Sequence, residues 1–318
     1  MNMRCRICGA EAEHPRFEAR ERMFGWGDRF GYFQCGRCGC LQIDSVPADL
    51  ARFYGNGYYA YGTPAYRNPL TAWLSGRRDA WALWGHSPVG RWLHRKRPRP
   101  DLLCLRRLQL KRSARILDVG CGAGHFLYAL RERGFANLLG VDPFLASDIH
   151  YPNGLVIERK DVAAVQGEWD LVCFHHSFEH IPDQQATLAS AARLLAPGGV
   201  CLLRLPIVPS VAWREYGVDW VQLDAPRHLY LHSEDSLRTL ATQVGLRLDA
   251  VQHDSTAFQF WGSEQYRRGI ALRDPRSLAQ DPASTLFTAA ELAAFERRAQ
   301  AANAAQAGDQ AAFYLQPA

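Results

Sequence analysis

The feature that most constrains the fold is an apolar run at residues 116–119 that leads directly into a turn with three closely spaced glycines. The aliphatic and β-branched side chains of this run predict a buried strand. The glycines let the backbone of the turn approach a ligand, and the segment from His125 predicts a helix whose first turn faces that ligand. The strand carries Asp118, and the glycines are Gly120, Gly122 and Gly124.

The spacing of these glycines distinguishes two kinds of ligand. A dinucleotide-binding turn has the pattern G-x-G-x-x-G, which requires a glycine at the position occupied here by His125. The pattern in this chain is D-x-G-x-G-x-G. A second strand is expected at residues 137–141, and it delivers Asp142 to a position where a carboxylate can accept both hydroxyls of a ribose. The alternative is another doubly wound α/β domain with a tight first turn.

The sequence after residue 150 alternates between strand and helix patterns. We expect strands at residues 155–157, 169–174, 200–205 and 246–251, and helices at residues 184–195 and 233–244. This alternation predicts an α/β fold with a doubly wound, Rossmann-like sheet. A histidine-rich segment follows the strand at residues 169–174, at the carboxyl edge where ligands bind in such sheets.

Four cysteines near the N-terminus predict a metal site. They form two C-x-x-C-G turns separated by 26 residues, and each turn can place two thiolates on one side of a tetrahedral ion. Four thiolates close the coordination shell of zinc, so the site is expected to be structural: the ligands are Cys5, Cys8, Cys35 and Cys38. The alternatives are an iron centre with the same ligands or a redox C-x-x-C pair. Cys40 is interpreted as a packed or spare thiol.

The length of 318 residues exceeds that of one small domain. We expect a zinc-ribbon module at residues 1–45, an aromatic- and arginine-rich helical connection at residues 46–112, and the α/β domain at residues 113–318. A helical insertion is expected at about residues 254–308. The aromatic, glycine-rich stretch at residues 53–61 suits either a loop that folds over a ligand or a hinge packed on the zinc module.

The positive charge of the chain is concentrated in one segment. Residues 77–112 contain eleven Lys or Arg and two Asp, a local charge of +9, whereas the whole chain carries +5. Tryptophans are interleaved with these cations. The segment could bind phosphates, a membrane surface or RNA, or it could be a solvated helix pair with arginine stems over apolar rings. No apolar run approaches the length of a membrane span and no apolar signal segment is present, so we expect a cytoplasmic protein.

With these motifs the sequence resembles the class I S-adenosylmethionine-dependent methyltransferases, whose first motif is this glycine loop and whose second is the acid at Asp142. The resemblance implies that S-adenosylmethionine is the methyl donor. It also implies that the sheet is mostly parallel, with an antiparallel last strand at residues 310–315. The implied cofactor contacts are Gly120, Gly122 and Gly124 around the methionine portion, Asp118 near its amino group, Asp142 on the ribose and Asp161 on the adenine.

Further motifs narrow the resemblance. The cysteine pairs, the stretch from Glu179 to Asp183 that reads E-H-I-P-D, and the segment around His228 are similar to sugar methyltransferases with an N-terminal zinc module. This likeness implies a role in polysaccharide biosynthesis, with a carbohydrate or nucleotide-linked sugar as acceptor, His228 as the base and His180 beside the substrate. Those enzymes place a tyrosine and a glutamate near the base, where this chain has Ala225 and Arg227. Arg227 is a candidate ligand for a phosphate of a nucleotide sugar.

The chemistry of methyl transfer also points to histidine. Transfer is an in-line displacement at a sulfonium carbon, and a hydroxyl or carbon-acid acceptor must lose a proton to a base. Histidine titrates near neutrality and is the natural base. The candidates near expected strand ends are His175, His176, His180 and His228.

Two other functions are compatible with the sequence. An RNA methyltransferase could use the zinc ribbon and the segment at residues 77–112 to bind nucleic acid. A non-catalytic scaffold could keep the cofactor fold and use the ribbon as an interaction module. Retention of Asp118, Asp142 and the three glycines argues against a decayed site.

Overall fold

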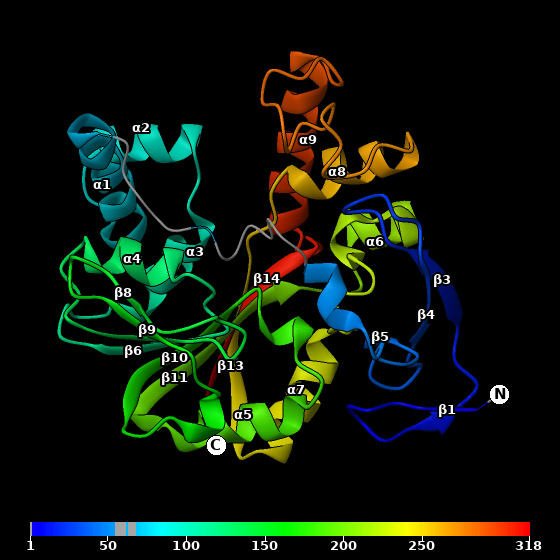
Figure 1. The fold of residues 1–318 in the computed structure, drawn as a ribbon, viewed down its shortest axis with the longest axis horizontal. Helices are drawn as coiled ribbons and strands as arrows, with labels where there is room; N and C mark the ends of the chain where they lie inside the picture. The colour runs from blue at the N-terminus through cyan, green and yellow to red at the C-terminus, as the bar shows by residue number, and fades with distance from the viewer. Residues whose placement is uncertain (1, 55–61, 63–67) are drawn as a thin grey trace. The chain divides into compact units, whose positions relative to one another are not determined.

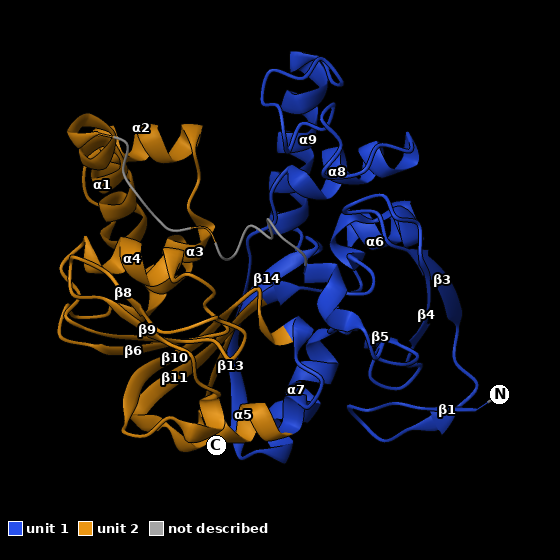
Figure 2. Ribbon diagram, in the orientation of Figure 1, with its two compact units in different colours: residues 1–55, 179–185, 205–312 blue, residues 56–178, 186–204, 313–318 orange. Residues whose placement is uncertain are grey.

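The computed structural model describes residues 2–54, 62 and 68–318, so most of the aromatic stretch at residues 53–61 lies outside the described residues. The chain divides into two compact units (Figure 2). Unit 1 comprises residues 1–55, 179–185 and 205–312, and unit 2 comprises residues 56–178, 186–204 and 313–318.

The largest element is an eight-stranded sheet with the order β13-β14-β11-β10-β6-β7-β9-β8. The pairs β10–β11, β10–β6, β6–β7 and β7–β9 are parallel, and the C-terminal strand is antiparallel, which confirms the Rossmann-like expectation. The strands are β6 Arg115–Val119, β7 Asn137–Val141, β8 Ile149–His150, β9 Val156–Glu158, β10 Trp169–His175, β11 Leu195–Pro206, β13 Leu246–His253 and β14 Gln310–Pro317.

The central strands β6 and β10 form the core of unit 2. Both are nearly continuous apolar runs, and Leu117 and Val172 pair directly and are fully buried. Such runs are typical of parallel strands that are covered on both faces. The helical elements between residues 69 and 193 are α1 Pro69–Trp84, α2 Pro88–Lys96, α3 Pro100–Leu103, η3 Cys104–Leu108, α4 His125–Arg131, η4 Val162–Ala164, η5 Phe178–His180 and α5 Gln184–Arg193.

Unit 1 contains a second, four-stranded sheet with the order β12-β5-β4-β3, next to a two-stranded hairpin of β1 and β2. Tyr32 and Phe33 of β4 are fully buried and form its core. The strand β12 comes from a distant part of the chain, so residues 1–45 do not complete this sheet alone. The elements are β1 Met3–Arg4, β2 Glu11–Ala12, β3 Arg16–Arg20, β4 Arg29–Gln34, β5 Leu41–Ile43, η1 Leu50–Tyr54 and β12 Tyr230–Leu231.

The remaining helices of unit 1 follow β11 in the chain. Ser233 is the N-cap of α7, as expected, because its hydroxyl accepts the backbone N–H of Ser236. Trp220 is fully buried, and its indole N–H donates to Asp309 at 2.9 Å. Two helices, α8 and α9, lie within residues 254–308 (Figure 1). The elements are α6 Val211–Tyr216, η6 Gly217–Asp219, η7 Val221–Leu223, α7 Glu234–Gln243, α8 Phe258–Arg267 and α9 Ala289–Ala304.

The helices of the described part of the chain are short or polar by the standards of membrane spans. No helix there combines the length and the apolar character that crossing a bilayer requires.

Candidate functional sites

In unit 2, β6 ends in the glycine loop, and all three glycines have positive φ. The φ angles are +70° at Gly120, +54° at Gly122 and +78° at Gly124, values that side chains disfavour. A Cβ on Gly120 would lie 2.6 Å from the Cβ of Ser177, and one on Gly124 would lie 2.5 Å from Cδ1 of Ile157. The loop is therefore bare backbone packed closely against its neighbours, which is a suitable cradle for a ligand.

Asp142, at the end of β7, is bonded to this loop. One carboxylate oxygen accepts the backbone N–H of Gly122 at 2.9 Å, and the other accepts that of Phe144 at 2.9 Å. Burial raises the pKa of Asp142, and these two bonds offset part of that rise. A carboxylate offers about four lone-pair sites, so about two are left for the hydroxyls of a ribose. The structure thus brings Gly122 and Asp142, both predicted from the sequence, into direct contact.

The other two predicted cofactor acids differ in their surroundings. Asp118 is buried near the end of β6, where the thiol of Cys173 donates to it at 3.6 Å. Burial raises the pKa of Asp118 to about 8, although the Cys173 bond opposes the rise. Asp161 is exposed and begins η4, where its side chain accepts the backbone N–H of Ala163 at 2.8 Å. A cation beside Asp118 would favour its ionised form.

The four predicted metal ligands converge in unit 1. The sulfurs of Cys5 and Cys38 are 3.6 Å apart, those of Cys8 and Cys35 are also 3.6 Å apart, and all four lie within 4.8 Å of one another. Tetrahedral zinc with Zn–S bonds of about 2.3 Å requires sulfur–sulfur distances of about 3.8 Å. All four are free thiols, so the donor set and its spacing fit a structural zinc ion.

Donors around the sulfurs support the same assignment. The Gln42 side-chain amide donates to the Cys5 sulfur at 3.1 Å, and the backbone N–H of Cys38 points to the Cys35 sulfur at 3.5 Å. Such contacts orient and stabilise thiolate ligands. Cys40 lies outside the cluster; it is fully buried and its thiol donates to the Leu41 carbonyl.

The sheet beside the cysteines is completed by the segment that follows His228. Tyr230 pairs with Gln42 in the β5–β12 ladder, and the backbone N–H of Ile43 donates to the Leu229 carbonyl at 3.0 Å. The Tyr32 hydroxyl donates to the carbonyl of His228 itself at 2.9 Å. The N-terminal, cysteine-containing part of the chain therefore fixes the backbone at His228 by hydrogen bonds.

His228 and His180 lie together, with ring centroids 4.7 Å apart. Nδ1 of His228 is 2.7 Å from the Gln222 carbonyl, and Nδ1 of His180 is 2.9 Å from the Arg227 carbonyl. A carbonyl can only accept, so both rings carry their N–H at Nδ1 and leave the lone pair of the neutral ring at Nε2. Burial, followed by the neighbouring His228, lowers the pKa of His180 to about 4. His180 is therefore neutral near pH 7.

Two acids face the Nε2 atom of His228. Glu179 and Asp224 each place a carboxylate oxygen 3.9 Å from it. Burial by itself would raise the pKa of Asp224, but the charge and hydrogen bonds of Arg227 outweigh burial and hold that pKa below its usual value. No local pattern in the sequence assigns a role to either acid. Glu179 precedes His180 directly and Asp224 lies three residues before Arg227, but only the fold shows that both acids reach the His228 ring.

Arg227 is placed differently from the expectation. Its side chain is fully buried, and its guanidinium donates to Asp224 at 2.6 Å, to Glu21 at 2.9 Å and to the Phe53 carbonyl at 3.2 Å. These partners occupy both ends of the guanidinium fork. The hypothesis that Arg227 binds a phosphate of the substrate is therefore wrong, because the group is enclosed by protein carboxylates.

The remaining candidate histidines have structural partners. The half-buried His175 packs on the Phe126 ring, with ring centroids 4.0 Å apart, and desolvation lowers its pKa to about 3. Nε2 of His176 lies 2.8 Å from the Arg204 guanidinium. The nearby His232, which is not one of the candidates, lies just before α7 and contacts Ser236 through Nδ1 and Gln184 through Nε2. These contacts leave His180 and His228 as the histidines suited to chemistry.

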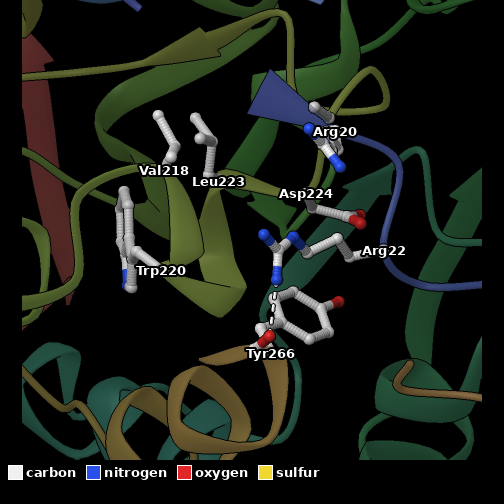
Figure 3. Close-up of a pocket in the computed structure, with 8 residues that line it drawn as sticks. Arg20, Arg22, Val218, Trp220, Leu223, Asp224 and Tyr266 are labelled. Carbon is white, nitrogen blue, oxygen red and sulfur yellow. Dashed lines mark hydrogen bonds between the residues drawn. The ribbon is translucent and has the colours of Figure 1, made fainter. Parts of the chain in front are cut away.

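A small recess of unit 1 adjoins Asp224 (Figure 3). Arg22 reaches into it, donates to the Tyr266 carbonyl at 2.5 Å and pairs with Asp219 at 2.6 Å. Trp220 and Leu223 complete its apolar wall. This packing supports the segment before His228 from one side.

Removal of zinc should destabilise unit 1. We expect Cys8→Ser to lose bound zinc and to lower the melting temperature, because the metal supplies folding free energy to a small sheet. The measurements are zinc content by mass spectrometry and thermal unfolding. Cys40→Ser is the matched control and should retain about one zinc per chain. Full zinc content in Cys8→Ser would contradict the assignment.

The buried ion cluster should be sensitive to loss of its cation. We expect Arg227→Met to cost about 3–5 kcal/mol, since Glu21 and Asp224 would be left as buried, uncompensated acids. Urea unfolding measures the loss. Arg238→Met removes an exposed pair with Glu234 and should change stability by less than about 0.5 kcal/mol. Equal losses in the free energy of unfolding would show that the buried Arg227 cluster stabilises the protein no more than an exposed ion pair does.

Comparison with known proteins identifies the family. The family model described as "Methyltransferase domain" matches residues 92–251, just over half of the chain. The ubiquinone biosynthesis O-methyltransferase of Pseudomonas aeruginosa strain UCBPP-PA14 is 31% identical over 100 residues, which cover 28% of this chain and 43% of that protein. The trans-aconitate 2-methyltransferase of Methylobacterium nodulans is 35% identical over 118 residues, which cover 35% of this chain and 45% of that protein.

The matches to these curated relatives thus span less than half of the relatives' length. Among solved structures, the phosphoethanolamine N-methyltransferase 2 of Haemonchus contortus in complex with S-adenosyl-L-methionine aligns with a TM-score of 0.42 and 15% identity, over 87% of this chain and 61% of that one. From the family match, the chain belongs to the class I S-adenosylmethionine-dependent methyltransferase domain family.

Proposed function

We propose that this protein transfers a methyl group from S-adenosylmethionine to a small acceptor, and that His228 removes a proton from the acceptor. The observation that carries the proposal is the environment of the His228 ring: its Nε2 faces two acids, and its Nδ1 lies within hydrogen-bonding distance of a carbonyl. Carboxylates at this distance would stabilise the imidazolium that forms when Nε2 takes a proton. Membership of the methyltransferase family supports the identity of the methyl donor.

The glycine loop and its acids would hold the donor. Gly120, Gly122 and Gly124 would surround the methionine portion, and Asp118 would lie near its amino group. Asp142 would receive the ribose hydroxyls and Asp161 the adenine edge. The bare, positive-φ loop and the two carboxylate lone-pair sites left on Asp142 fit these roles. When bound, S-adenosylmethionine supplies an electrophilic methyl group on a sulfonium ion.

His228 and the residues around it would deprotonate and orient the acceptor. Nε2 of His228 would take the proton, and the ionised Asp224 with Glu179 would stabilise the imidazolium ring that results. His180, neutral near pH 7, would orient the acceptor by hydrogen bonding. Arg227 would keep Asp224 ionised and in place without touching the substrate.

The acceptor we favour is a sugar or glycan precursor. Several hydrogen-bonding groups gather at the histidines, including the Tyr54 hydroxyl, which lies 3.0 Å from Nδ1 of His180. Such groups suit the hydroxyls of a carbohydrate. The combination of cysteine pairs, the E-H-I-P-D stretch and His228 supports the same class through its likeness to sugar methyltransferases.

Labelling identifies the acceptor class. The zinc-loaded protein is incubated with methyl-labelled S-adenosylmethionine and a fractionated cell extract, and label is followed into carbohydrate, RNA and protein fractions. Label in nucleotide-sugar or polysaccharide fractions supports the proposal. Label in RNA would replace it with the nucleic acid alternative, and cofactor binding without label in any fraction would favour the scaffold.

Substitution of the proposed base should lower turnover and leave the binding of S-adenosylmethionine unchanged. We expect His228→Asn to lower kcat by about 10²–10⁴-fold with little change in the Kd for S-adenosylmethionine, because the base acts on the acceptor. Turnover assays and calorimetric titration measure the two quantities. His86→Asn, at an exposed position in the turn between α1 and α2, is the control and should keep full activity. Full turnover in His228→Asn would remove this residue from the mechanism.

A side chain in the glycine loop should impair cofactor binding. We expect Gly120→Ala to raise the Kd for S-adenosylmethionine by about tenfold or more, because φ is positive there and the new Cβ would collide with Ser177. Gly198→Ala is a matched control, since Gly198 also has positive φ, +75°, but has open space around its Cβ position. An unchanged Kd in folded Gly120→Ala would contradict the proposal that the glycine loop binds S-adenosylmethionine.

A further inference from the structure

The helical hairpin of α1 and α2, residues 68–97, carries an unusual concentration of exposed apolar side chains. Seven large hydrophobic residues are strongly exposed in the part of the chain that the structure describes. Four of them lie in this hairpin, with exposed fractions of 65% at Leu70, 52% at Trp73, 50% at Val89 and 60% at Trp92. Scattered exposed apolar residues need no explanation, whereas such a cluster marks an interaction surface.

The spacing of these residues places them in two stripes. Leu70, Trp73 and Arg77 follow an i, i+3, i+7 pattern on α1, so they share one face of that helix. Val89 and Trp92 are three residues apart on α2 and share a face in the same way. Both stripes are exposed, so neither serves the core of unit 2.

The hairpin is well packed, so the exposure does not come from loose helices. A Cβ on Gly90 would meet the Arg77 carbonyl and would lie 2.7 Å from the Cβ of Trp81, which shows how closely the two helices approach. The ring of Trp81 also lies 4.7 Å from that of His94. The helices begin at side-chain N-caps, Asn68 for α1 and Ser87 for α2. Figure 1 shows the two helices side by side.

The charge exposed by this hairpin is entirely positive. Its only acid is Asp79, which is buried and paired with Arg78 at 2.9 Å. The exposed cations stand next to the apolar stripes, and one of them, Arg77, lies over the Trp73 ring at 5.3 Å. They are Arg77, Arg91, Arg95, Lys96 and Arg97.

We propose that this hairpin docks the protein on an anionic lipid surface. Trp73 and Trp92 enter the boundary between headgroups and acyl chains, where tryptophan is favoured, and the surrounding cations contact lipid phosphates. The aliphatic residues decide between a bilayer and a nucleic acid. Tryptophan and arginine suit both, but Leu70 and Val89 cannot stack on bases and gain free energy only by leaving water.

This inference goes beyond the proposed methyl transfer and does not depend on His228. It adds a place of action, namely a membrane surface at which a lipid-linked or membrane-associated acceptor would be presented. The helices interact with a bilayer from one side, in keeping with their short length, and the contact is reversible.

Vesicle binding tests the proposal with the full-length, zinc-loaded protein. We expect sedimentation with vesicles of phosphatidylcholine and phosphatidylglycerol, weaker sedimentation with phosphatidylcholine alone, and weakening by high salt. Quenching of tryptophan fluorescence by brominated lipid should accompany binding, because it requires entry of the rings. The double variant Trp73→Ser/Trp92→Ser should lose about tenfold or more in vesicle affinity and all added quenching.

Two further variants make the result specific. Arg91→Gln/Arg95→Gln should lose the preference for anionic vesicles while keeping circular dichroism and melting temperature unchanged. Phe144→Ser removes an aromatic side chain that is 82% exposed outside the hairpin, and it should bind vesicles like the wild type. A loss in Phe144→Ser equal to that of the tryptophan variant would overturn the proposal.

Three other outcomes would also overturn it. The first is failure of the wild type to bind anionic vesicles. The second is binding without quenching by brominated lipid, which would mean adsorption by charge alone. The third is tight, salt-sensitive binding of single-stranded RNA, measured by fluorescence anisotropy, that the tryptophan variant abolishes while vesicle binding is unaffected. Loss of methyl transfer in the His228 variant with normal vesicle binding would leave this inference intact.

Discussion

The arrangement of the histidine site depends on one buried cation. Arg227 joins Glu21, which follows β3 in the N-terminal sheet, to Asp224, which lies just before His228 in the chain. Two acids without a cation would be very costly at full burial, so the guanidinium fixes where both segments can lie. The same contact keeps Asp224 ionised and directs it toward the His228 ring.

The cysteine cluster acts on the same segment by a different route. Its sheet is completed by β12, only two residues after His228, and Tyr32 of that sheet binds the His228 carbonyl. A metal that closes the cysteine turns would therefore stabilise the backbone of the proposed base. The cysteine cluster, which fits a structural zinc ion, and the proposed base therefore depend on the same sheet.

The groups around His228 differ from those that the resemblance to sugar methyltransferases implies. The sugar methyltransferases that the chain resembles have a tyrosine and a glutamate near the base, at positions where this chain has Ala225 and Arg227. Here Glu179 and Asp224 supply the carboxylates and Tyr54 supplies a hydroxyl beside His180. The sequence predicts a substrate contact for Arg227, whereas in the structure its guanidinium pairs with Asp224 and Glu21.

The sequence by itself determined the glycine loop, the parallel sheet and the cysteine ligands, because each follows from local spacing: apolar runs make strands, positive-φ positions require glycine, and C-x-x-C turns bring sulfurs together. It also placed Asp142, since an acid at the end of the second strand must meet the loop after the first. Only the tertiary structure decided these partners of Arg227, His180 and His228, because Glu21, Tyr54 and Glu179 lie 206, 126 and 49 residues away from them in the chain. Contacts between such distant segments are set by packing and by the need to neutralise buried charge, and neither is encoded in any local pattern.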